Sequence, residues 1–194
     1  MLHRVSRGTY SLSEIDQVEY KPQINRSLKN LFGKVRNQFP YIVTCLWSTK
    51  WLSEFMLHQP GRFYTILEVE KDAMEAVFHD LNSQGREVFL NPSVEILNNY
   101  VVNAKEPIII VSLTTEAPTL EIENTVTTSL EKMLVDIYCE PELFSTFQGA
   151  EMKRIYQSSF EKYLINNSKM LRYANRRGKK IEIQELINDI KERQ

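Results

Sequence analysis

Two acidic residues at the end of a strand-like segment are the strongest candidates for chemistry in this sequence. Glu68 and Glu70 lie two positions apart at the end of the apolar run that begins at Phe63, so on a strand both carboxylates would point to one face. Carboxylates paired in this way can hold Mg²⁺ for phosphoryl or nucleotidyl chemistry. One function to consider is therefore a metal-dependent nucleotidyltransferase- or nuclease-like enzyme that uses Glu68 and Glu70.

The residues around this pair do not complete either kind of site. A nucleotidyltransferase would need a Gly-Ser turn upstream to hold phosphates, and the sequence there is Pro60-Gly61-Arg62. A nuclease of the Asp…Glu-x-Lys type needs a lysine two residues after its glutamate, whereas Lys71 directly follows Glu70. Glu70 and Asp72 are also explained as acids in the first turn of a following helix, where they complement its dipole. We therefore expect neither catalytic residues nor a metal site.

The other residues that could do chemistry are scattered. His3, His58 and His79 fall in separate segments, and no serine or cysteine lies in a nucleophile-elbow or Cys-His pattern. The six glycines never cluster, so no loop is typical of phosphate binding. Cys45 and Cys139 have neither metal-ligand nor redox spacing and are expected to be buried free thiols. These patterns predict neither nucleophilic catalysis nor a nucleotide cofactor, so we expect no cofactor.

The net charge of −1 is distributed unevenly along the 194 residues. Residues 1–36 carry seven bases and three acids, residues 37–161 carry eight bases and eighteen acids, and residues 162–180 carry seven bases and no acid. A basic run of this kind is either a solvated helix face or a contact surface for an acidic partner or nucleic acid. The residues that we expect on such a surface are Lys169, Arg172, Arg176, Arg177, Lys179 and Lys180.

Strand-like and helix-like segments alternate through the middle of the chain. Strands are predicted over 41–46, 63–69, 86–90 and 107–111, and helices in the intervals after Ser48, over 71–84 and over 93–98. Such alternation predicts an α/β fold with a mixed, mainly parallel sheet that is flanked by helices. The unbroken apolar run Ile108–Val111 is predicted to be the central strand, and a hairpin is predicted around Asn124.

The last third of the chain is predicted to form a C-terminal helical layer. Thr128 and Glu131 have the spacing of a capping box ahead of an apolar helix. Asp136 in this helix is either exposed or paired with a base, such as Lys132 four residues earlier or an arginine from another element. The helical part, 127–194, belongs to an α/β domain predicted over 37–194.

The first dozen residues read like the end of a structural element whose beginning is missing. Two short strands are predicted around Gly8, where a positive φ costs little. We expect residues 1–36 to hold this remnant hairpin and a linker helix near 24–32. No leader sequence or membrane-spanning run is evident, so the protein is expected to be cytoplasmic.

Two segments resemble the AbiEi-type antitoxins, a family of winged-helix transcriptional regulators encoded beside AbiEii nucleotidyltransferase toxins in type IV, abortive-infection-like toxin–antitoxin systems. RVSRGTYSL (Arg4–Leu12) is similar to the wing of the family, including Gly8 and Tyr10. TSLEKMLVD (Thr128–Asp136) is similar to the signature of its C-terminal domain, where the matching residues are Glu131, Lys132 and Asp136. The recognition helix that precedes the wing in this family is not in the sequence.

This resemblance implies a non-catalytic regulatory or antitoxin-like protein, equivalent to the C-terminal part of an AbiEi-type regulator without most of its winged helix-turn-helix. Its expected partners are a neighbour-encoded nucleotidyltransferase-like toxin and a second copy of the chain in a homodimer. Arg4 and Arg7 would be the remaining wing contacts to DNA phosphates, which predicts weak, non-specific binding. No membrane partner is expected.

Overall fold

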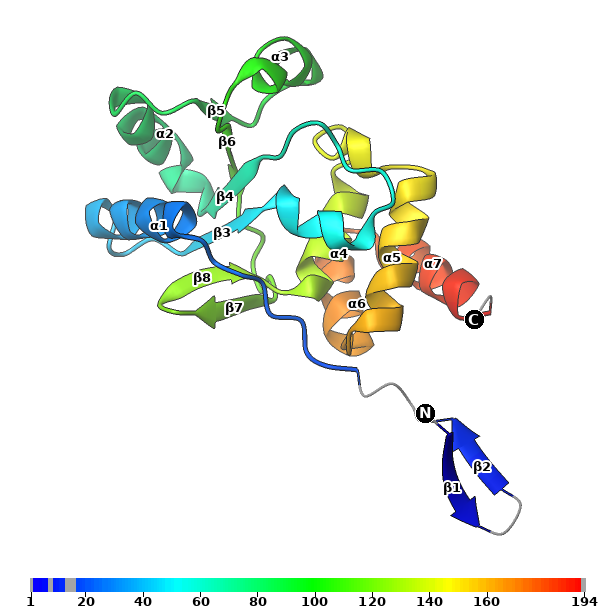
Figure 1. Ribbon diagram of the computed structural model, residues 1–194. Coiled ribbons are helices and arrows are strands. Elements are labelled where there is room, and N and C mark those ends of the chain that lie inside the picture. The colour runs from blue at the N-terminus through cyan, green and yellow to red at the C-terminus, as the bar shows by residue number, and fades with distance from the viewer. Residues whose placement is uncertain (1, 7–8, 13–16, 193–194) are drawn as a thin grey trace.

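The computed structural model of the chain describes residues 2–6, 9–12 and 17–192, and the side chains of 17–192. Figure 1 shows a layered arrangement in which a sheet separates two sets of helices. The sheet contains β3 (Thr44–Ser48), β4 (Thr65–Val69), β6 (Ile108–Ser112) and β5 (Val88–Leu90), in that order. β3 is antiparallel to β4, whereas β4, β6 and β5 are parallel. The predicted α/β class with a mixed, mainly parallel sheet is confirmed.

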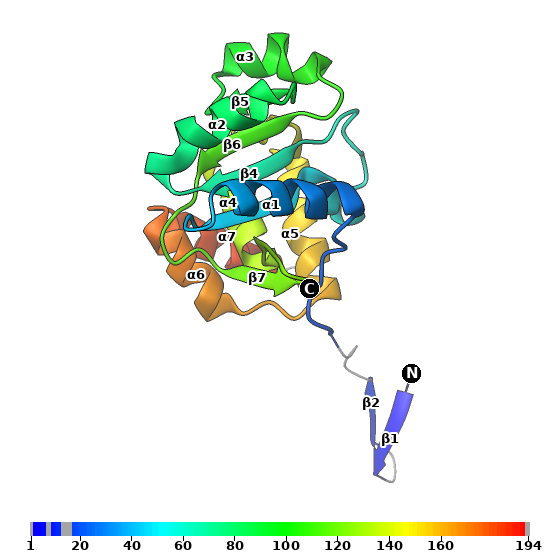
Figure 2. The ribbon, with the colours of Figure 1, turned by 90° about the vertical axis from the view of Figure 1, so that its left-hand side faces the viewer.

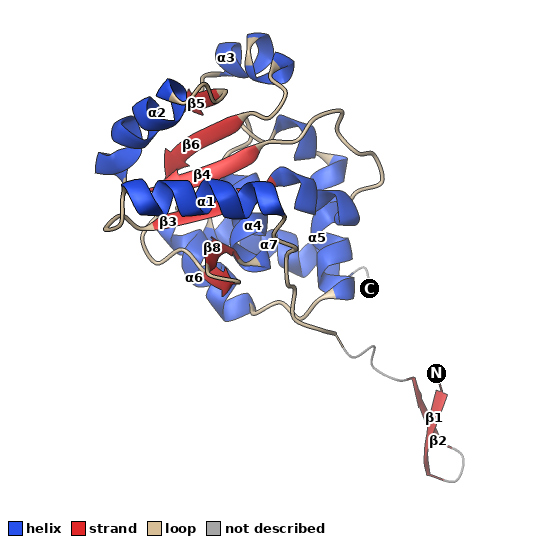
Figure 3. Ribbon diagram, turned by 60° about the vertical axis from the view of Figure 1, so that its left-hand side comes forward, coloured by secondary structure: helices blue, strands red, loops and turns tan. Residues whose placement is uncertain are grey.

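The helices lie on both faces of this sheet, as Figures 2 and 3 show from two further directions. One face is covered by α1 (Arg26–Gln38) and α2 (Met74–Ser83). The other face meets the C-terminal helical layer, which consists of α4 (Leu130–Cys139), α5 (Ala150–Lys162), α6 (Asn167–Arg176) and α7 (Lys180–Glu192). α3 (Val94–Asn99) lies between β5 and β6 in the sequence.

Alternation along the strands assigns each residue to one of two cores. Leu67 and Val69 of β4 pack with α1 and α2, whereas Ile66 packs with the C-terminal helical layer. β6 divides in the same way, with Ile108 and Ile110 on the first side and Ile109 on the second. Both faces of β6 are therefore buried, and it has a strand on either side, which confirms that 108–111 is central.

Several local predictions are corrected by the structure. The first strand of the sheet is Thr44–Ser48 and not 41–46, because Tyr41 and Val43 are exposed. Ser48 does cap a helix, but this is the short 3₁₀ helix η1 (Thr49–Phe55), which ends well before Pro60. The cap of α4 is Ser129, whose hydroxyl accepts a hydrogen bond from the Lys132 amide. Thr128 instead ends the preceding strand.

Helix α1 belongs to the core of the α/β part. Its buried residues Leu28, Leu31, Phe32 and Val35 pack against the sheet. The helix is longer than predicted and ends at Gln38, so the domain boundary predicted at residue 36 falls inside it. The apolar residues of α1 recur at helical spacing, so one side of this helix packs against the sheet, although its segment is polar enough to resemble a linker.

A second hairpin, β7 (Thr119–Ile122) and β8 (Thr125–Thr128), precedes α4 and confirms the hairpin predicted around Asn124. Its two turn residues, Glu123 and Asn124, have φ of 49° and 60°. Two consecutive positive φ values are those of a type I′ turn, which matches the twist of the strands even without glycine. The Thr127 hydroxyl donates a hydrogen bond to the Leu46 carbonyl, which joins β8 to β3.

The N-terminal hairpin consists of β1 (Leu2–Ser6) and β2 (Thr9–Leu12), with Arg4 opposite Tyr10. Arg7 and Gly8, two residues of the predicted wing, lie outside the described residues. Within the described part of the chain, every helix is too short or too polar to cross a lipid bilayer.

Candidate functional site

Glu68 is buried in the sheet, on the face that meets α4. The alternation of β4 turns Ile66 and Glu68 toward the C-terminal helical layer, and only 3% of Glu68 is exposed. The indole Nε1–H of Trp47, on the neighbouring strand β3, donates a hydrogen bond of 2.9 Å to Glu68 Oε1. Glu70 lies beyond the end of β4 and is exposed. The two carboxylates that the sequence analysis paired are thus in different environments.

Lys132 of α4 is the partner of Glu68. Its side chain is fully buried, and its Nζ lies 2.5 Å from Glu68 Oε1 and 2.5 Å from Asp136 Oδ2. Burial would lower the pKa of Lys132, but Asp136 and Glu68 raise it well above its ordinary value, so the ammonium keeps its proton. Burial raises the pKa of Glu68, and Lys132 opposes that rise only in part.

Asp136 continues these contacts toward α6. Its Oδ1 accepts hydrogen bonds from the Tyr173 hydroxyl at 2.7 Å and from Arg177 Nη1 at 3.1 Å. Arg177 Nη2 lies 2.5 Å from Glu140 Oε1 near the surface. Two alternatives were open for Asp136, exposure or pairing with a base. The structure shows pairing, with both Lys132 and Arg177. We call the five charged residues the charge network: Glu68, Lys132, Asp136, Arg177 and Glu140.

The geometry of α4 explains why these groups meet. Lys132, Asp136 and Glu140 follow one another at intervals of four residues, so they lie along one side of the helix and its C-terminal end. Arg177 is the C-cap residue of α6, where the partial negative charge of a helix end favours a cation. Burial would lower the pKa of Arg177, whereas the nearby Asp136 raises it, with the net effect upward.

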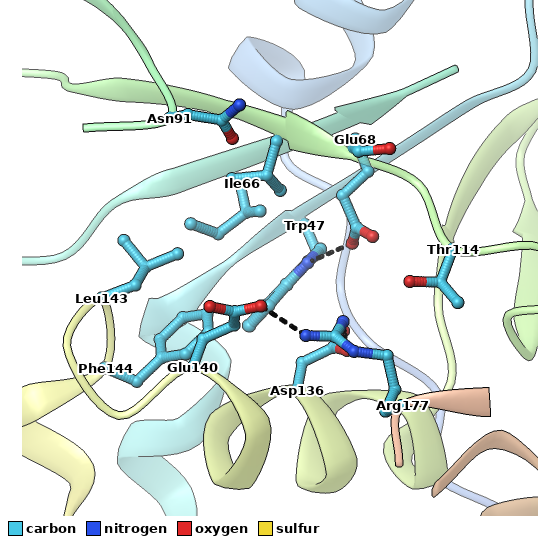
Figure 4. A pocket seen from close by; sticks show the side chains of 12 residues that line it. Trp47, Ile66, Glu68, Asn91, Thr114, Asp136, Glu140, Leu143, Phe144 and Arg177 are labelled. Carbon is cyan, nitrogen blue, oxygen red and sulfur yellow. Dashed lines mark hydrogen bonds and ion pairs between the residues drawn. The ribbon is translucent and has the colours of Figure 1, made fainter. Parts of the chain in front are cut away.

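A pocket of about 340 Å³ opens beside the charge network. Asn91 follows β5, and Ser112 and Thr114 lie at and after the end of β6, so these residues come from the carboxyl ends of parallel strands. This edge is where open α/β sheets usually bind ligands. Figure 4 shows its lining residues, which are Trp47, Ile66, Glu68, Asn91, Val111, Ser112, Thr114, Asp136, Glu140, Leu143, Phe144 and Arg177.

Most of the predicted basic surface is paired with acids of the same chain. Arg176 pairs with Glu116, and Lys179 Nζ lies 2.8 Å from Glu182. Lys169 lies 3.7 Å from Glu131, and Arg177 belongs to the charge network. Among the six residues, Arg172 and Lys180 are exposed and have no ion pair with the described part of the chain.

The residues of the family signature separate in the structure. Lys132 and Asp136 belong to the charge network, whereas Glu131 lies on another side of α4, where its Oε1 accepts a hydrogen bond from the Asn166 amide. Tyr10 lies on the N-terminal hairpin. Over the residues that the structure describes, no three His, Cys, Asp or Glu side chains gather as metal ligands. Cys45 is buried, as predicted, but Cys139 is only partly buried.

Sequence reasoning missed the contact of Glu68 with Lys132, the role of Trp47 and Tyr173, and the pocket. One signal was present: a lysine at the centre of the apolar run of α4 must find a buried carboxylate, because an unpaired buried ammonium is costly.

The family comparison covers nearly the whole chain. A family model with the description "Family of unknown function (DUF6577)" matches residues 1–193. The comparison with curated proteins and the comparison with solved structures each found no match. Since the match extends across the N-terminal hairpin, the sheet and the helical layer, the chain belongs to the DUF6577 family of unknown function.

Proposed function

We propose that the chain is a non-catalytic regulatory protein of the antitoxin-like kind, which acts by binding a protein partner and contacts DNA only weakly. The main support is the position of Lys132. Its Nζ lies 2.5 Å from a carboxylate oxygen of Glu68 and 2.5 Å from one of Asp136. A catalytic metal ion would need the space between the buried carboxylates of Glu68 and Asp136, and the Lys132 ammonium already occupies that space.

The alternative function, a metal-dependent nucleotidyltransferase or nuclease that uses Glu68 and Glu70, has less support. Mg²⁺ prefers oxygen ligands at about 2.0–2.1 Å in octahedral geometry. At Glu68, Oε1 already accepts hydrogen bonds from Trp47 and Lys132, and Glu70 lies beyond the end of β4 and is exposed. A metal held between the carboxylates of Glu68 and Asp136 would have to displace a fully buried ammonium.

Activity assays test the absence of catalysis. The chain is incubated with Mg²⁺ or Mn²⁺ and plasmid DNA, and separately with labelled nucleoside triphosphates and RNA. We expect neither cleavage nor nucleotide transfer above the background of a heat-treated sample. Metal-dependent turnover that disappears in both Glu68→Gln and Glu70→Ala would favour the enzyme instead.

Co-expression tests the regulatory part of the proposal. The probe is the product of the adjacent reading frame, and we expect it to be nucleotidyltransferase-like, to copurify with the chain and to be less toxic in its presence. Arg172 and Lys180 of the predicted surface have no ion pair with the described part of the chain, so Arg172→Glu/Lys180→Glu should weaken copurification, and the difference from the parent chain should shrink as salt rises. Lys34→Glu/Arg36→Glu, on exposed positions of α1, is the matched control. An adjacent product that is unrelated, or that stays toxic and unbound, would contradict the antitoxin assignment.

DNA binding should be weak because, of the six residues of the predicted basic surface, only Arg172 and Lys180 have no acidic partner in the described part of the chain. We expect a dissociation constant of roughly 10⁻⁴ to 10⁻⁶ M with no sequence preference and a shallow dependence on salt. Fluorescence anisotropy with two unrelated duplexes at several salt concentrations measures both properties. Nanomolar binding to one duplex alone would contradict this expectation.

A further inference from the structure

The pocket beside the charge network has the position and size of a ligand site, whether or not the regulatory proposal holds. Its volume of about 340 Å³ is within the range of small-molecule sites. Trp47, Ile66 and Phe144 contribute a buried apolar wall, of which Trp47 and Phe144 are stacked with their ring centroids 5.7 Å apart. A rigid wall of this kind holds the apolar part of a ligand without first having to be ordered.

The charges that line the pocket favour a cation. Three carboxylates, from Glu68, Asp136 and Glu140, line the pocket. The cations beside them are the buried ammonium of Lys132 and the guanidinium of Arg177, which leaves one negative charge in excess. That guanidinium is already bound by Asp136 and Glu140. An anion entering the pocket would thus meet an excess of negative charge and no free base from its lining.

Glu68 supplies a buried acceptor that the chain does not use fully. Its hydrogen bonds to Trp47 and Lys132 both end on Oε1, and its side chain is only 4% exposed. Oε2 therefore remains available on a carboxylate that lines the pocket (Figure 4). Oε2 is thus a carboxylate acceptor that the N–H group of a ligand in the pocket can bind.

Uncharged polar side chains also line the pocket. Asn91, Ser112 and Thr114 line the pocket, and their side chains make no hydrogen bond with the described residues. Asn91 has a φ of 39°, in the left-handed region, which costs free energy for a residue other than glycine. Such a conformation often occurs at binding sites, where the surrounding structure maintains it.

We propose that this pocket binds the ammonium, amidinium or guanidinium group of an organic cation, with the N–H groups directed to Glu68 and Glu140 and the adjoining apolar part on Ile66 and Phe144. The cation can come from a free small molecule or from a lysine or arginine side chain of a protein. Both sources present the same chemistry to the pocket, so the experiment has an arm for each.

A series of isosteric probes tests the charge preference. Benzamidine, benzamide and benzoate have nearly the same shape and carry a positive, zero and negative charge. They are titrated into the full chain labelled with ¹⁵N, and the two indole N–H signals are followed. Trp47 lines the pocket and Trp51 does not, so the Trp51 signal is an internal reference. We expect benzamidine to shift the Trp47 signal and to bind at least fivefold more tightly than benzamide, with benzoate weaker still.

A variant that removes the negative charge of Glu140 tests whether the cation binds in this pocket. Glu140→Gln should weaken benzamidine about fivefold, the effect typical of a half-exposed charge pair. Glu142→Gln makes the same change two residues away at an exposed position that does not line the pocket, and should leave the affinity unchanged. Equal affinity for benzamidine and benzamide, shifts confined to Trp51, or equal effects of the two variants would overturn the proposal.

The second arm identifies the source of the cation. Agmatine represents a free small molecule, and acetyl-Ala-Arg-Ala-amide represents an arginine in a protein chain. Binding of agmatine alone supports a small-molecule ligand, whereas binding of the peptide at similar or higher affinity supports a protein side chain. If neither shifts the Trp47 signal at millimolar concentration, the proposal fails even if benzamidine binds.

Discussion

The two faces of the central sheet bury different kinds of side chains, although they share the same strands. On the face toward α1 and α2, β4 contributes Leu67 and Val69 to an apolar core, and none of the buried charged residues in the described part of the chain belongs to it. On the face toward α4, the same strand contributes Ile66 and Glu68, and the core surrounds a buried lysine. The first face is the simpler way to stabilise a sheet. The second includes charges that a stable fold does not need.

The difference indicates what each face contributes. Burial of apolar side chains gives up to about 25 cal/mol per Å² of apolar area removed from water. A buried ion pair gains much less, because the free energy of desolvation offsets most of the attraction between the charges. Burying Glu68, Lys132 and Asp136 therefore adds little to stability, and their position fits a role in binding at the pocket beside them.

The largest effect in this comparison should follow the loss of the buried ammonium. In Lys132→Met, Glu68 and Asp136 would be buried without their common base, and we expect the free energy of unfolding to fall by about 3–5 kcal/mol. Urea denaturation near pH 7 measures the loss. The double variant Glu68→Gln/Lys132→Met should recover part of it because one stranded charge is gone. A loss below about 1 kcal/mol would show that Lys132, although buried, matters no more to the free energy of unfolding than a lysine in an exposed ion pair.

A cavity on the other face should cost slightly less. Leu67→Ala removes a fully buried side chain between the sheet and the helices α1 and α2, and we expect a loss of about 3 kcal/mol. The same urea titrations apply. Its effect and that of Lys132→Met should add in the double variant, since the two residues belong to opposite cores; strong non-additivity would show that the faces are not independent.

The two faces should also differ in their response to alkali. Three groups on the face toward α4 have raised pKa values: Cys45, Lys132 and Tyr156. Burial raises the pKa of the Cys45 thiol and of the Tyr156 phenol. Burial would lower the pKa of Lys132, but the neighbouring carboxylates Asp136 and Glu68 raise it further. Unfolded chains lose these protons at about pH 8.5, 10.4 and 10. The folded state then holds more protons, so the stabilisation present at lower pH is lost as pH rises through this range.

This alkaline loss can be assigned to one face by the two variants above. Lys132→Met should show a shallower decline of stability between about pH 9 and pH 11 than the parent chain, whereas Leu67→Ala should keep the parent slope. Unfolding at a series of pH values measures both slopes. If Leu67→Ala flattened the decline as much as Lys132→Met, the titrating groups would have to lie elsewhere.

The smallest effect is expected at the surface. Lys29 of α1 pairs with Glu123, but their side chains are 42% and 60% exposed. Lys29→Met is the same substitution as at position 132, and it should change the free energy of unfolding by less than about 1 kcal/mol, with the difference reduced further by salt. A loss comparable with that of Lys132→Met would show that burial does not distinguish the two lysines.

The fold could be predicted largely from local patterns. The apolar runs that form β4 and β6 and the helical spacing of α2, α5 and α7 gave the class and the sheet type, because these periodicities reflect burial directly. The first strand was misplaced because Tyr41 and Val43 have strand-forming side chains but are exposed in the structure. Local propensity cannot reveal which part of such a run meets the core.

The candidate site was predictable only within one helix. The pairing of Lys132 with Asp136 follows from their spacing of four residues. The contact between Lys132 and Glu68 spans 64 positions, and that between Arg177 and Asp136 spans 41. Such contacts depend on how β4, α4 and α6 pack together. Most of the acids that neutralise the basic run, such as Glu116 for Arg176 and Glu131 for Lys169, likewise come from distant segments.

The hydrogen bond between Thr127 and the Leu46 carbonyl has a consequence for association between molecules. β3 is an edge strand, and a free edge offers its backbone groups to any other strand, which is a route to aggregation. Here a threonine hydroxyl of β8 binds one of those carbonyls at 2.6 Å, so the hairpin shields the edge without extending the sheet. The opposite edge, β5, has only three residues. Two copies of this sheet are thus poorly suited to join strand to strand.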